Sequence, residues 1–236
     1  MPDVTQLDAT AASRTVALSE TESHHLSRVM RLTAGDAIII FNGRGESWDA
    51  ELVVAGKHAT ARLVKPRPAG PAAPARLALA IALLKGDAMD DIVRDATALG
   101  VAEIIPMVTA HAVVPKRARG GEAVARWERV AVASAKQCGQ LTLPTIAEVT
   151  PLNEVLRRDI HTKLMCVEPA LGGAHVSAIA SDSILVLIGP EGGWSEEEVA
   201  AARAAGCHTI TLGPLTLRAE LAPVVAVTRI MSAIQA

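Results

Sequence analysis

Two apolar runs near the C-terminal end of the chain each end at a Gly-Pro pair. Residues 184–188 (ILVLI) contain only Ile, Leu and Val, which is typical of a strand buried on both faces of a parallel sheet. Residues 208–212 predict a second strand, and the Gly-Pro pairs follow at 189–190 and 213–214. Such pairs also mark ordinary connections between elements. Because ligands of open α/β sheets bind at the carboxyl ends of strands, the two neighbouring junctions predict one ligand pocket.

Helix-start signals accompany these strands. Ser195 is a candidate N-cap, and Glu198, three residues later, completes the pattern of a capping box. The helix is predicted to end near Gly206, and an Ala- and Val-rich helix is expected after the second Gly-Pro pair, running to the C-terminus. Thr150 followed by Pro151 predicts one more helix start, with Thr150 as the N-cap.

The middle of the chain alternates strand and helix patterns. Residues 77–85 (LALAIALLK) predict a buried strand, residues 89–99 carry apolar side chains at helical spacing, and residues 103–108 predict the next strand. A long helix around Trp127 and a strand at 163–167 follow. Because crossovers between parallel strands are right-handed, this order predicts a doubly wound α/β fold with a parallel sheet.

The N-terminal part of the chain has a different pattern. Residues 14–65 combine short strand patterns with one helix and predict a small β-barrel-like module. Residues 66–75 (PRPAGPAAPA) contain four prolines and a glycine, which neither a strand nor a helix accommodates, so they predict a semi-rigid linker. We therefore expect two domains, at residues 1–70 and 76–236.

Composition narrows the class of protein. No apolar segment reaches the roughly 18–20 residues of a membrane helix, and the N-terminus lacks the basic start and apolar core of a signal peptide, so a cytoplasmic protein without a membrane partner is expected. The three cysteines have neither CxxC spacing nor an adjacent His pair, which argues against a disulfide framework and a metal site. Aromatic residues are only three Trp and one Phe, so RNA would be held through backbone charge and shape rather than by stacked bases.

Two groups of basic side chains are candidates for contact with RNA phosphates. One lies on the predicted helix at 19–32 and in the NGRG turn at 42–45. The other is the densest basic segment of the chain, in a loop that follows the strand at 103–108. Both patterns are also typical of an ordinary solvated surface. The residues are Arg28, Arg31, Arg44, Lys116, Arg117 and Arg119.

Several kinds of chemistry are excluded by missing motifs. The GPEGG segment at 189–193 lacks both the GxGxxG spacing and the residues of a P-loop, and the chain contains no GxSxG or HExxH motif. What remains is a pocket built from backbone groups and aliphatic side chains, which suits a neutral or zwitterionic cofactor with a flat ring. S-adenosylmethionine has that character.

The segments at 187–199 (LIGPEGGWSEEEV) and 212–222 (LGPLTLRAELA) resemble the two C-terminal motifs of the RsmE family. These are the 16S rRNA uridine-N3 methyltransferases of the SPOUT superfamily. Segments at 24–36, 83–106 and 135–139 resemble the other motifs of that family, in the same order. The resemblance implies S-adenosyl-L-methionine as methyl donor, 16S rRNA of the small ribosomal subunit as substrate, a PUA-like N-terminal domain, a C-terminal trefoil knot and a homodimer.

The resemblance also implies roles for individual residues. Arg218 and Glu220 are the candidate catalytic residues: the guanidinium holds a phosphate or a uracil carbonyl, and the carboxylate accepts the imide proton or fixes Arg218. An ion pair at a helix start is the structural alternative. Lys85 joins the candidate RNA contacts. The residues expected to bind the cofactor are Glu168, Ile188, Gly189, Pro190, Glu191, Gly192, Gly193, Leu212, Gly213, Leu217 and Ala222.

The chain departs from the family pattern at the edge of the expected pocket. Leu215 stands where an Arg is expected, Leu221 where a Thr is expected, and Gln140 where an Arg is usual. Three functions therefore remain open. They are methylation of N3 of a 16S rRNA uridine, methylation of another RNA by a SPOUT enzyme, and RNA binding at the ribosome with impaired catalysis.

Overall fold

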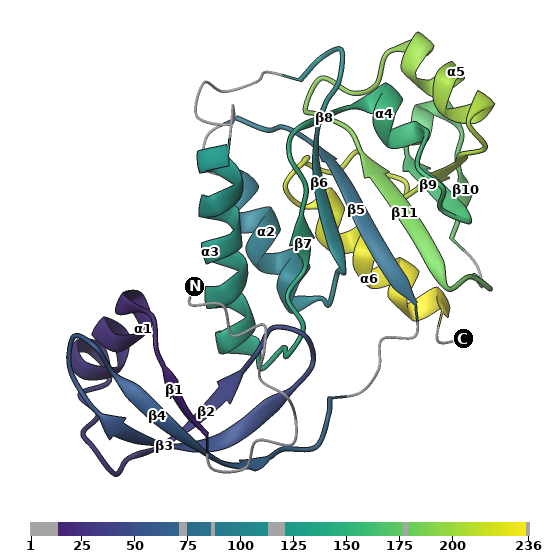
Figure 1. The fold of residues 1–236 in the computed structure, drawn as a ribbon. Helices are drawn as coiled ribbons and strands as arrows, with labels where there is room; N and C mark the ends of the chain where they lie inside the picture. The colour runs from purple at the N-terminus through teal and green to yellow at the C-terminus, as the bar shows by residue number, and fades with distance from the viewer. Residues whose placement is uncertain (1–13, 71–74, 86–87, 113–120, 177–178, 235–236) are drawn as a thin grey trace. The chain divides into compact units, whose positions relative to one another are not determined.

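Contacts along the chain divide it into two units, Met1–Pro71 and Ala72–Ala236. The structure is a computed structural model that describes residues 14–70, 75–85, 88–112, 121–176 and 179–234 (Figure 1). The predicted RNA contacts Lys116, Arg117 and Arg119 lie outside the described residues.

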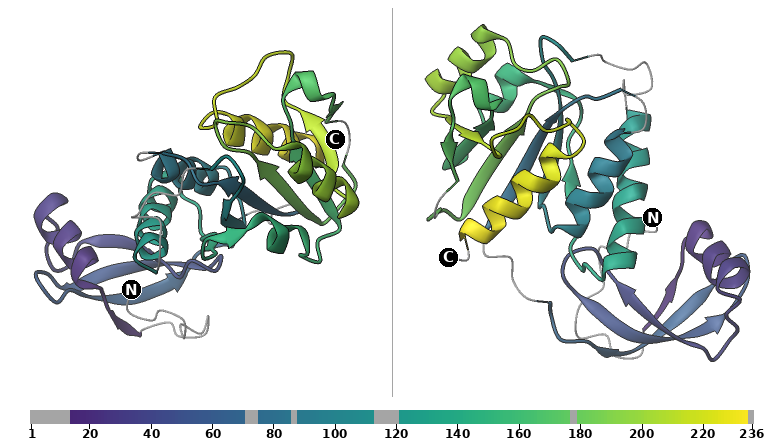
Figure 2. Two further views of the ribbon diagram at one scale, coloured as in Figure 1. Left: turned by 90° about the horizontal axis from the view of Figure 1, so that it is seen from above. Right: turned by 180° about the vertical axis from the view of Figure 1, so that it is seen from behind.

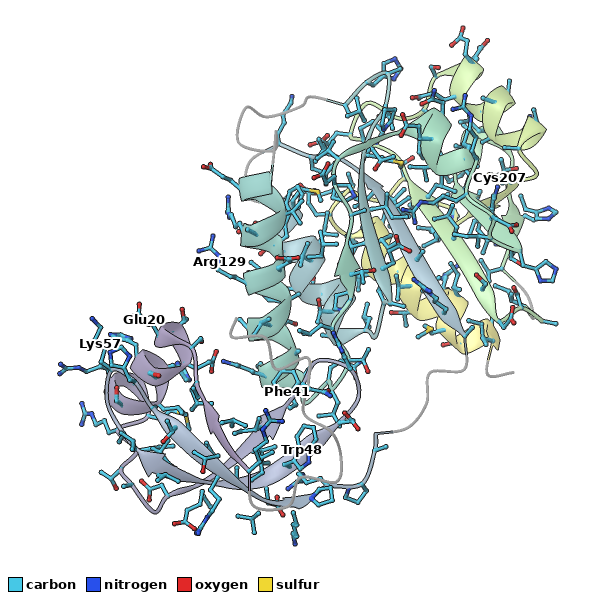
Figure 3. The ribbon with its side chains drawn as sticks, in the orientation of Figure 1. Glu20, Phe41, Trp48, Lys57, Arg129 and Cys207 are labelled. Atoms are coloured by element: carbon cyan, nitrogen blue, oxygen red, sulfur yellow. The ribbon has the colours of Figure 1, made fainter. Side chains whose placement is uncertain are left out.

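The N-terminal unit is an antiparallel sheet with one short helical segment. The strands pair in the order β1-β4-β3-β2. Trp48 is 2% exposed and packs with Ala50, Ala61 and Leu63 on the inner face, so one large aromatic side chain fills most of this small core (Figure 3). The elements are β1 (Thr15–Ala17), α1 (Glu20–His24), the π-helical segment η2 (His25–Val29), β2 (Ala37–Phe41), β3 (Ser47–Val54) and β4 (Thr60–Pro66).

The outer face of this sheet carries charged side chains that pair across the strands. Arg62 bonds Glu51 at 2.7 Å, and Arg67 bonds Asp49 at 2.6 Å, with Lys65 3.4 Å from the same carboxylate. The hydrogen bond from Arg67, aided by Lys65, holds the pKa of Asp49 below its usual value. The basic residues on this face are therefore matched by acidic partners.

The C-terminal unit is an eight-stranded sheet in which every pair of strands is parallel (Figures 1 and 2). The strand order is β10-β12-β9-β11-β5-β6-β7, and β8 also pairs with β6. The elements are β5 (Arg76–Ala82), α2 (Ala88–Ala98), β6 (Glu103–Val108), α3 (Gly121–Cys138), β7 (Thr145–Ile146), β8 (Thr150–Pro151), α4 (Leu152–Leu156), β9 (Thr162–Cys166), η4 (Pro169–Leu171), β10 (Ala174–His175), β11 (Ser183–Ile188), α5 (Glu196–Ala204), β12 (His208–Thr211) and α6 (Ala222–Ile234).

Both faces of this sheet are covered by helices, as the predicted doubly wound fold requires. Alternate residues of β5 enter different cores: Leu77, Leu79 and Ile81 pack with α2, α3 and α6, whereas the intervening alanines pack with α4 and α5. The central strand β11 shows the same alternation and is completely buried from Ile184 to Leu187. The continuous apolar runs in the sequence thus arise from strands with no solvent-facing side, and the predicted parallel α/β sheet is confirmed.

Element boundaries differ from the predictions at several places: most strand bounds shift by one residue, and the helix predicted at 19–32 ends at Val29. The strand predicted at 77–85 ends at Ala82, although the next two leucines stay buried. Thr150 is not the N-cap of α4: it belongs to β8, its hydroxyl bonds the carbonyl of Glu148, and Pro151 occupies the cap position without a side-chain hydrogen bond. Pairing of β8 with β6 overrides the local Thr-Pro signal. The last helix begins at Ala222, so residues 212–221 form a long loop.

No helix among the described segments has both the length and the apolar character needed to cross a membrane.

Candidate functional site

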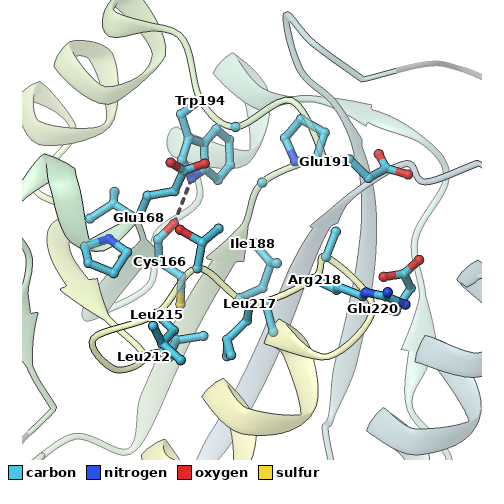
Figure 4. A pocket seen from close by; sticks show the side chains of 18 residues that line it. Cys166, Glu168, Ile188, Glu191, Trp194, Leu212, Leu215, Leu217, Arg218 and Glu220 are labelled. Atoms are coloured by element: carbon cyan, nitrogen blue, oxygen red, sulfur yellow. Dashed lines mark hydrogen bonds between the residues drawn. The ribbon is translucent and has the colours of Figure 1, made fainter.

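Three neighbouring parallel strands end at one edge of the sheet and deliver three loops there. β9 leads to Glu168, β11 leads to the segment 189–193, here called the glycine loop, and β12 leads to the loop at 212–221. These loops surround a pocket of about 420 Å³ (Figure 4). A volume of this size lies within the range of about 300–1,000 Å³ typical of small-molecule sites.

Most of the predicted cofactor-binding residues line this pocket. Gly192 and Gly213 do not line it, and both candidate catalytic residues, Arg218 and Glu220, do. The predicted residues that line it are Glu168, Ile188, Gly189, Pro190, Glu191, Gly193, Leu212, Leu217 and Ala222. The lining residues absent from the prediction are Cys166, Val167, Pro169, Trp194, Leu215, Thr216 and Ala219.

Trp194 is the most informative of the missed residues. Its indole Nε1 donates a hydrogen bond of 2.8 Å to the carbonyl of Cys166, which joins the end of the glycine loop to the end of β9 (Figure 4). The ring lies against Gly189, where an added Cβ would be only 2.9 Å from the Trp194 Cε2 atom. The position of this Trp directly after GPEGG, in a chain with only four aromatic residues, is the sequence feature that could have identified it as part of the site.

The conformation of the glycine loop also requires glycine at 193. Gly193 has φ of 71°, a left-handed conformation that residues with a Cβ rarely adopt. Its N–H donates to the carbonyl of Pro190 at 3.0 Å and closes a tight turn. An added Cβ at this position would lie 3.2 Å from Oε1 of Glu168, so the loop backbone approaches the neighbouring carboxylate directly.

The helix that follows is anchored by the predicted capping box. The Ser195 hydroxyl accepts the N–H of Glu198 at 3.2 Å, and the Glu198 carboxylate accepts the N–H of Ser195 at 3.0 Å. This reciprocal bonding satisfies two backbone donors and fixes the point at which the chain leaves the pocket.

The charge of the pocket lining is negative. Glu168, Glu191 and Glu220 contribute carboxylates, against the single guanidinium of Arg218. Burial raises the pKa of the Cys166 thiol to about 12, so this side chain stays neutral at ordinary pH. Such a lining favours a ligand that carries positive charge together with apolar surface.

Arg218 and Glu220 lie at one end of the pocket, opposite Glu168 in this view (Figure 4). The carbonyl of Arg218 accepts the N–H groups of Leu221 and Ala222, both at 3.0 Å, which forms the turn into α6. Neither side chain takes part in an ion pair with another described residue, including the other one. Both are exposed and remain available to a ligand.

The described RNA-contact candidates lie in both units. Arg28, Arg31 and Arg44 are exposed in the N-terminal unit, and Lys85 is exposed just after β5, where its backbone N–H lies 3.5 Å from the Glu191 carboxylate.

Among the described residues, no group of three or more His, Cys, Asp or Glu side chains is arranged to hold a metal ion.

Comparison with known proteins gives consistent matches over most of the chain. The family described as RNA methyltransferase domain matches residues 71–231, and the family described as RNA methyltransferase PUA domain matches residues 18–63. The ribosomal RNA small subunit methyltransferase E of Synechocystis sp. is 32% identical and covers 92% of this chain and 72% of its own length. The protein of the same name from Bacillus subtilis is 30% identical, covering 92% and 89%.

Two solved structures share the fold along nearly the full length. The ribosomal RNA small subunit methyltransferase E of Neisseria gonorrhoeae, bound to S-adenosyl methionine, has a TM-score of 0.86 at 28% identity and covers 94% of this chain and 93% of its own. A putative methyltransferase of Legionella pneumophila, in complex with the same cofactor, has a TM-score of 0.86 at 25% identity with the same coverage.

The contact between Gly189 and Trp194 leads to a first prediction. Gly189→Ala introduces a Cβ against the indole, so we expect the Trp194 Nε1–H bond to break and stability to fall by about 1–3 kcal/mol, the usual cost of overpacking. Hydrogen exchange of the indole N–H, followed by NMR, and urea unfolding measure the two effects. Gly121→Ala is the matched control, because no atom of the described residues, its chain neighbours and its own helix aside, lies within 4 Å of its added Cβ. Unchanged exchange at Trp194 in Gly189→Ala would contradict the prediction.

Proposed function

This chain belongs to the ribosomal RNA small subunit methyltransferase E (RsmE) family, and from that premise we propose that it methylates N3 of a uridine in 16S rRNA with S-adenosylmethionine as donor. The observation that carries the proposal is the pocket at the carboxyl ends of β9, β11 and β12, walled by a glycine loop with the sequence of the family motif.

The residues of the pocket fit S-adenosylmethionine. Ile188, Leu212 and Leu217 offer apolar contacts to a flat adenine ring, and the backbone of Gly189 and Gly193 lines the pocket without a side chain of its own. The carboxylates of the lining suit the positively charged amino and sulfonium groups of the cofactor. When bound, the cofactor supplies a methyl group on a positively charged sulfur.

The chain itself must hold the uridine and receive its imide proton. We assign the proton to the Glu220 carboxylate and the orientation of the base to the Arg218 guanidinium, which bonds a uracil carbonyl or a neighbouring phosphate. Their position at one end of the pocket, on the exposed loop before α6, supports these roles. Because no metal is required, holding the base against the donor supplies much of the rate.

RNA binding is assigned to two regions. We propose residues 1–70 as the PUA-like RNA-binding domain, residues 76–236 as the catalytic domain and residues 66–75 as the linker. Lys85 and the basic segment at 116–119 are proposed to contact RNA close to the catalytic domain. In the N-terminal unit the candidates are Arg28, Arg31 and Arg44, whose side chains are exposed.

Arg31 has an additional structural argument for a role in binding. It has φ of 57°, in the left-handed region, and it ends the helical segment where Leu32 N–H bonds the Leu26 carbonyl at 2.9 Å. Glycine would occupy such a position with less strain, by roughly 1 kcal/mol. An exposed Arg at a position that favours glycine supports a functional contact.

Assembly and location follow from the same premise. We propose a homodimer, whose interface lies near the pocket, with the knotted C-terminal segment of the family. The exposed leucines at the pocket edge support an interface: Leu215 is 74% exposed and Leu221 is 49% exposed. A ribosomal substrate places the protein in the cytoplasm.

The same two leucines support a second candidate function. They replace polar residues of the family pattern, so the chain would retain the fold and bind RNA at the ribosome without efficient catalysis. A SPOUT enzyme acting on another RNA is the third possibility. Cofactor binding and the identity of the modified nucleotide distinguish these functions.

The main prediction concerns both cofactor and product. We expect calorimetry to detect binding of S-adenosylmethionine to the purified protein, and mass analysis of 16S rRNA from a strain lacking the protein to show loss of one N3-methyluridine. Unmethylated small subunits from that strain should regain the modification in vitro. An absence of cofactor binding would favour the non-catalytic function, and an unchanged N3-methyluridine would exclude the proposed substrate.

The second prediction separates catalysis from binding. Arg218→Ala and Glu220→Gln should each lower the methylation rate at saturating cofactor by about 10²-fold or more, the usual contribution of a positioned acid, base or donor. Affinity for S-adenosylmethionine should change much less. Thr228→Ala on α6, an exposed residue bonded only to its own helix among the described contacts, is the control. Full activity in both variants would remove the catalytic assignment.

The third prediction tests Arg31. Replacing the left-handed Arg with Gly should raise stability by about 0.5–1 kcal/mol and weaken binding to small-subunit RNA, with the slope of log K against log salt reduced by about 1. Filter binding at several salt concentrations and urea unfolding measure both quantities. Arg62→Gln, on the paired sheet face, should leave RNA affinity unchanged. A stabilised variant that binds RNA like the natural protein would refute the contact.

A further inference from the structure

The segment Thr109–Ala112, which follows β6, contacts the glycine loop from outside the pocket. The N–H of Ala112 donates to the Thr109 carbonyl at 3.2 Å, so the segment forms a turn. From this turn the N–H of Ala110 donates to Oε1 of Glu198 at 2.7 Å. Glu198 is the third residue of α5 and completes its capping box, so the β6 turn is bonded to the helix that the glycine loop leads into.

His111 makes the second contact from the same turn. Its Nδ1 lies 3.1 Å from the carbonyl oxygen of Gly192 and 3.2 Å from that of Gly193. A carbonyl oxygen only accepts hydrogen bonds, so Nδ1 must carry the proton. The contact therefore assigns the tautomer of the neutral imidazole, and it survives protonation of the ring, because Nδ1 keeps its hydrogen in the imidazolium.

This contact also explains why residue 192 is a glycine although it does not line the pocket. A Cβ added at Gly192 would lie 3.0 Å from the Cβ of His111. Only glycine at this position allows the imidazole to approach the loop backbone so closely. The glycine at 192 therefore serves a contact with the β6 turn, whereas those at 189 and 193 face the pocket.

The charged groups around the imidazole belong to the first turn of α5. The backbone N–H of Glu197 and the Ser195 hydroxyl lower the pKa of the Glu197 carboxyl, and the charge of His111 adds to this effect. The Glu198 carboxylate already accepts the N–H groups of Ala110 and Ser195.

We propose that His111 is a positioning residue for the cofactor: its Nδ1–H fixes the carbonyls of Gly192 and Gly193 and thereby holds the glycine loop as a wall of the pocket. The inference rests on the proposed binding of S-adenosylmethionine. A loop with three glycines has little side-chain packing of its own and loses much conformational entropy when it becomes ordered. A hydrogen bond from outside the loop orders it before the cofactor binds, so less entropy is lost on binding. His111 itself does not line the pocket.

The tautomer can be tested on the unaltered protein. In ¹⁵N NMR spectra recorded where the His111 ring is neutral, we expect the hydrogen on Nδ1. This measurement needs neither cofactor nor RNA, so it remains valid even if the proposed function fails. A neutral ring with its hydrogen on Nε2 would overturn the inference.

Variants test the consequence for the cofactor. His111→Ala should raise the Kd for S-adenosylmethionine by about three- to tenfold, as expected for one net hydrogen bond, and His111→Asn, which retains an N–H donor, should restore part of the affinity. KM for the cofactor should rise in parallel, while kcat on unmethylated small subunits stays near that of the natural protein, because His111 touches no reacting group. His208→Ala, which removes an exposed histidine of β12, is the matched control.

The outcomes separate the inference from the function on which it rests. If the natural protein binds S-adenosylmethionine and His111→Ala binds it equally well, the positioning role is wrong and the function stands. A lower kcat with an unchanged KM for the cofactor would also overturn the role. If the natural protein itself shows no binding, the proposed function fails, whatever the tautomer.

Discussion

The parallel pairing of β9, β11 and β12 with their neighbours is the constraint on which the rest of the structure depends. Parallel strands bring all their carboxyl ends to one edge, so three segments far apart in sequence must deliver their following loops to the same place. β11 sits between β9 and β5 and is buried on both faces, so it cannot shift without breaking both cores. The pocket is thus held by the most buried part of the sheet.

Much of this arrangement could be predicted because local and global preferences agree. β6 was predicted with its observed bounds, and the capping box of α5 forms as the spacing of Ser195 and Glu198 indicates. The Thr150 prediction was wrong because a two-residue strand pairing with β6 competes with the cap. The start of α6 was left open, because the pattern of Ala and Val does not reveal that the ten residues before Ala222 form a loop that passes along the pocket.

The site residues also fall into two groups: those that local motifs identify, and those that depend on contacts between segments distant in sequence. Backbone motifs identify the loops, and most of the residues expected there do line the pocket. What pattern alone could not supply were contacts between distant segments: Trp194 bonded to the carbonyl of Cys166, and Gly192 packed against His111 instead of facing the pocket. A glycine looks the same in the sequence whether it is needed for a left-handed conformation or for close contact with another segment, and only its neighbours in space distinguish these reasons.

The glycine loop at one end of the pocket is held by several hydrogen bonds, whereas the end with Arg218 and Glu220 is open. Trp194, directly after the glycine loop, donates a hydrogen bond to the end of β9, and His111 bonds the loop to the β6 turn. The N–H of Gly193 closes a tight turn within the loop itself. In contrast, the exposed side chains of Arg218 and Glu220 have no ion-pair partner among the described residues, and Leu215 of the same loop is largely exposed. A wall fixed by several bonds favours a preorganised cofactor site, whereas an open edge must be ordered by its substrate. If the proposed function holds, substrate RNA or a second copy of the chain would order this end of the pocket.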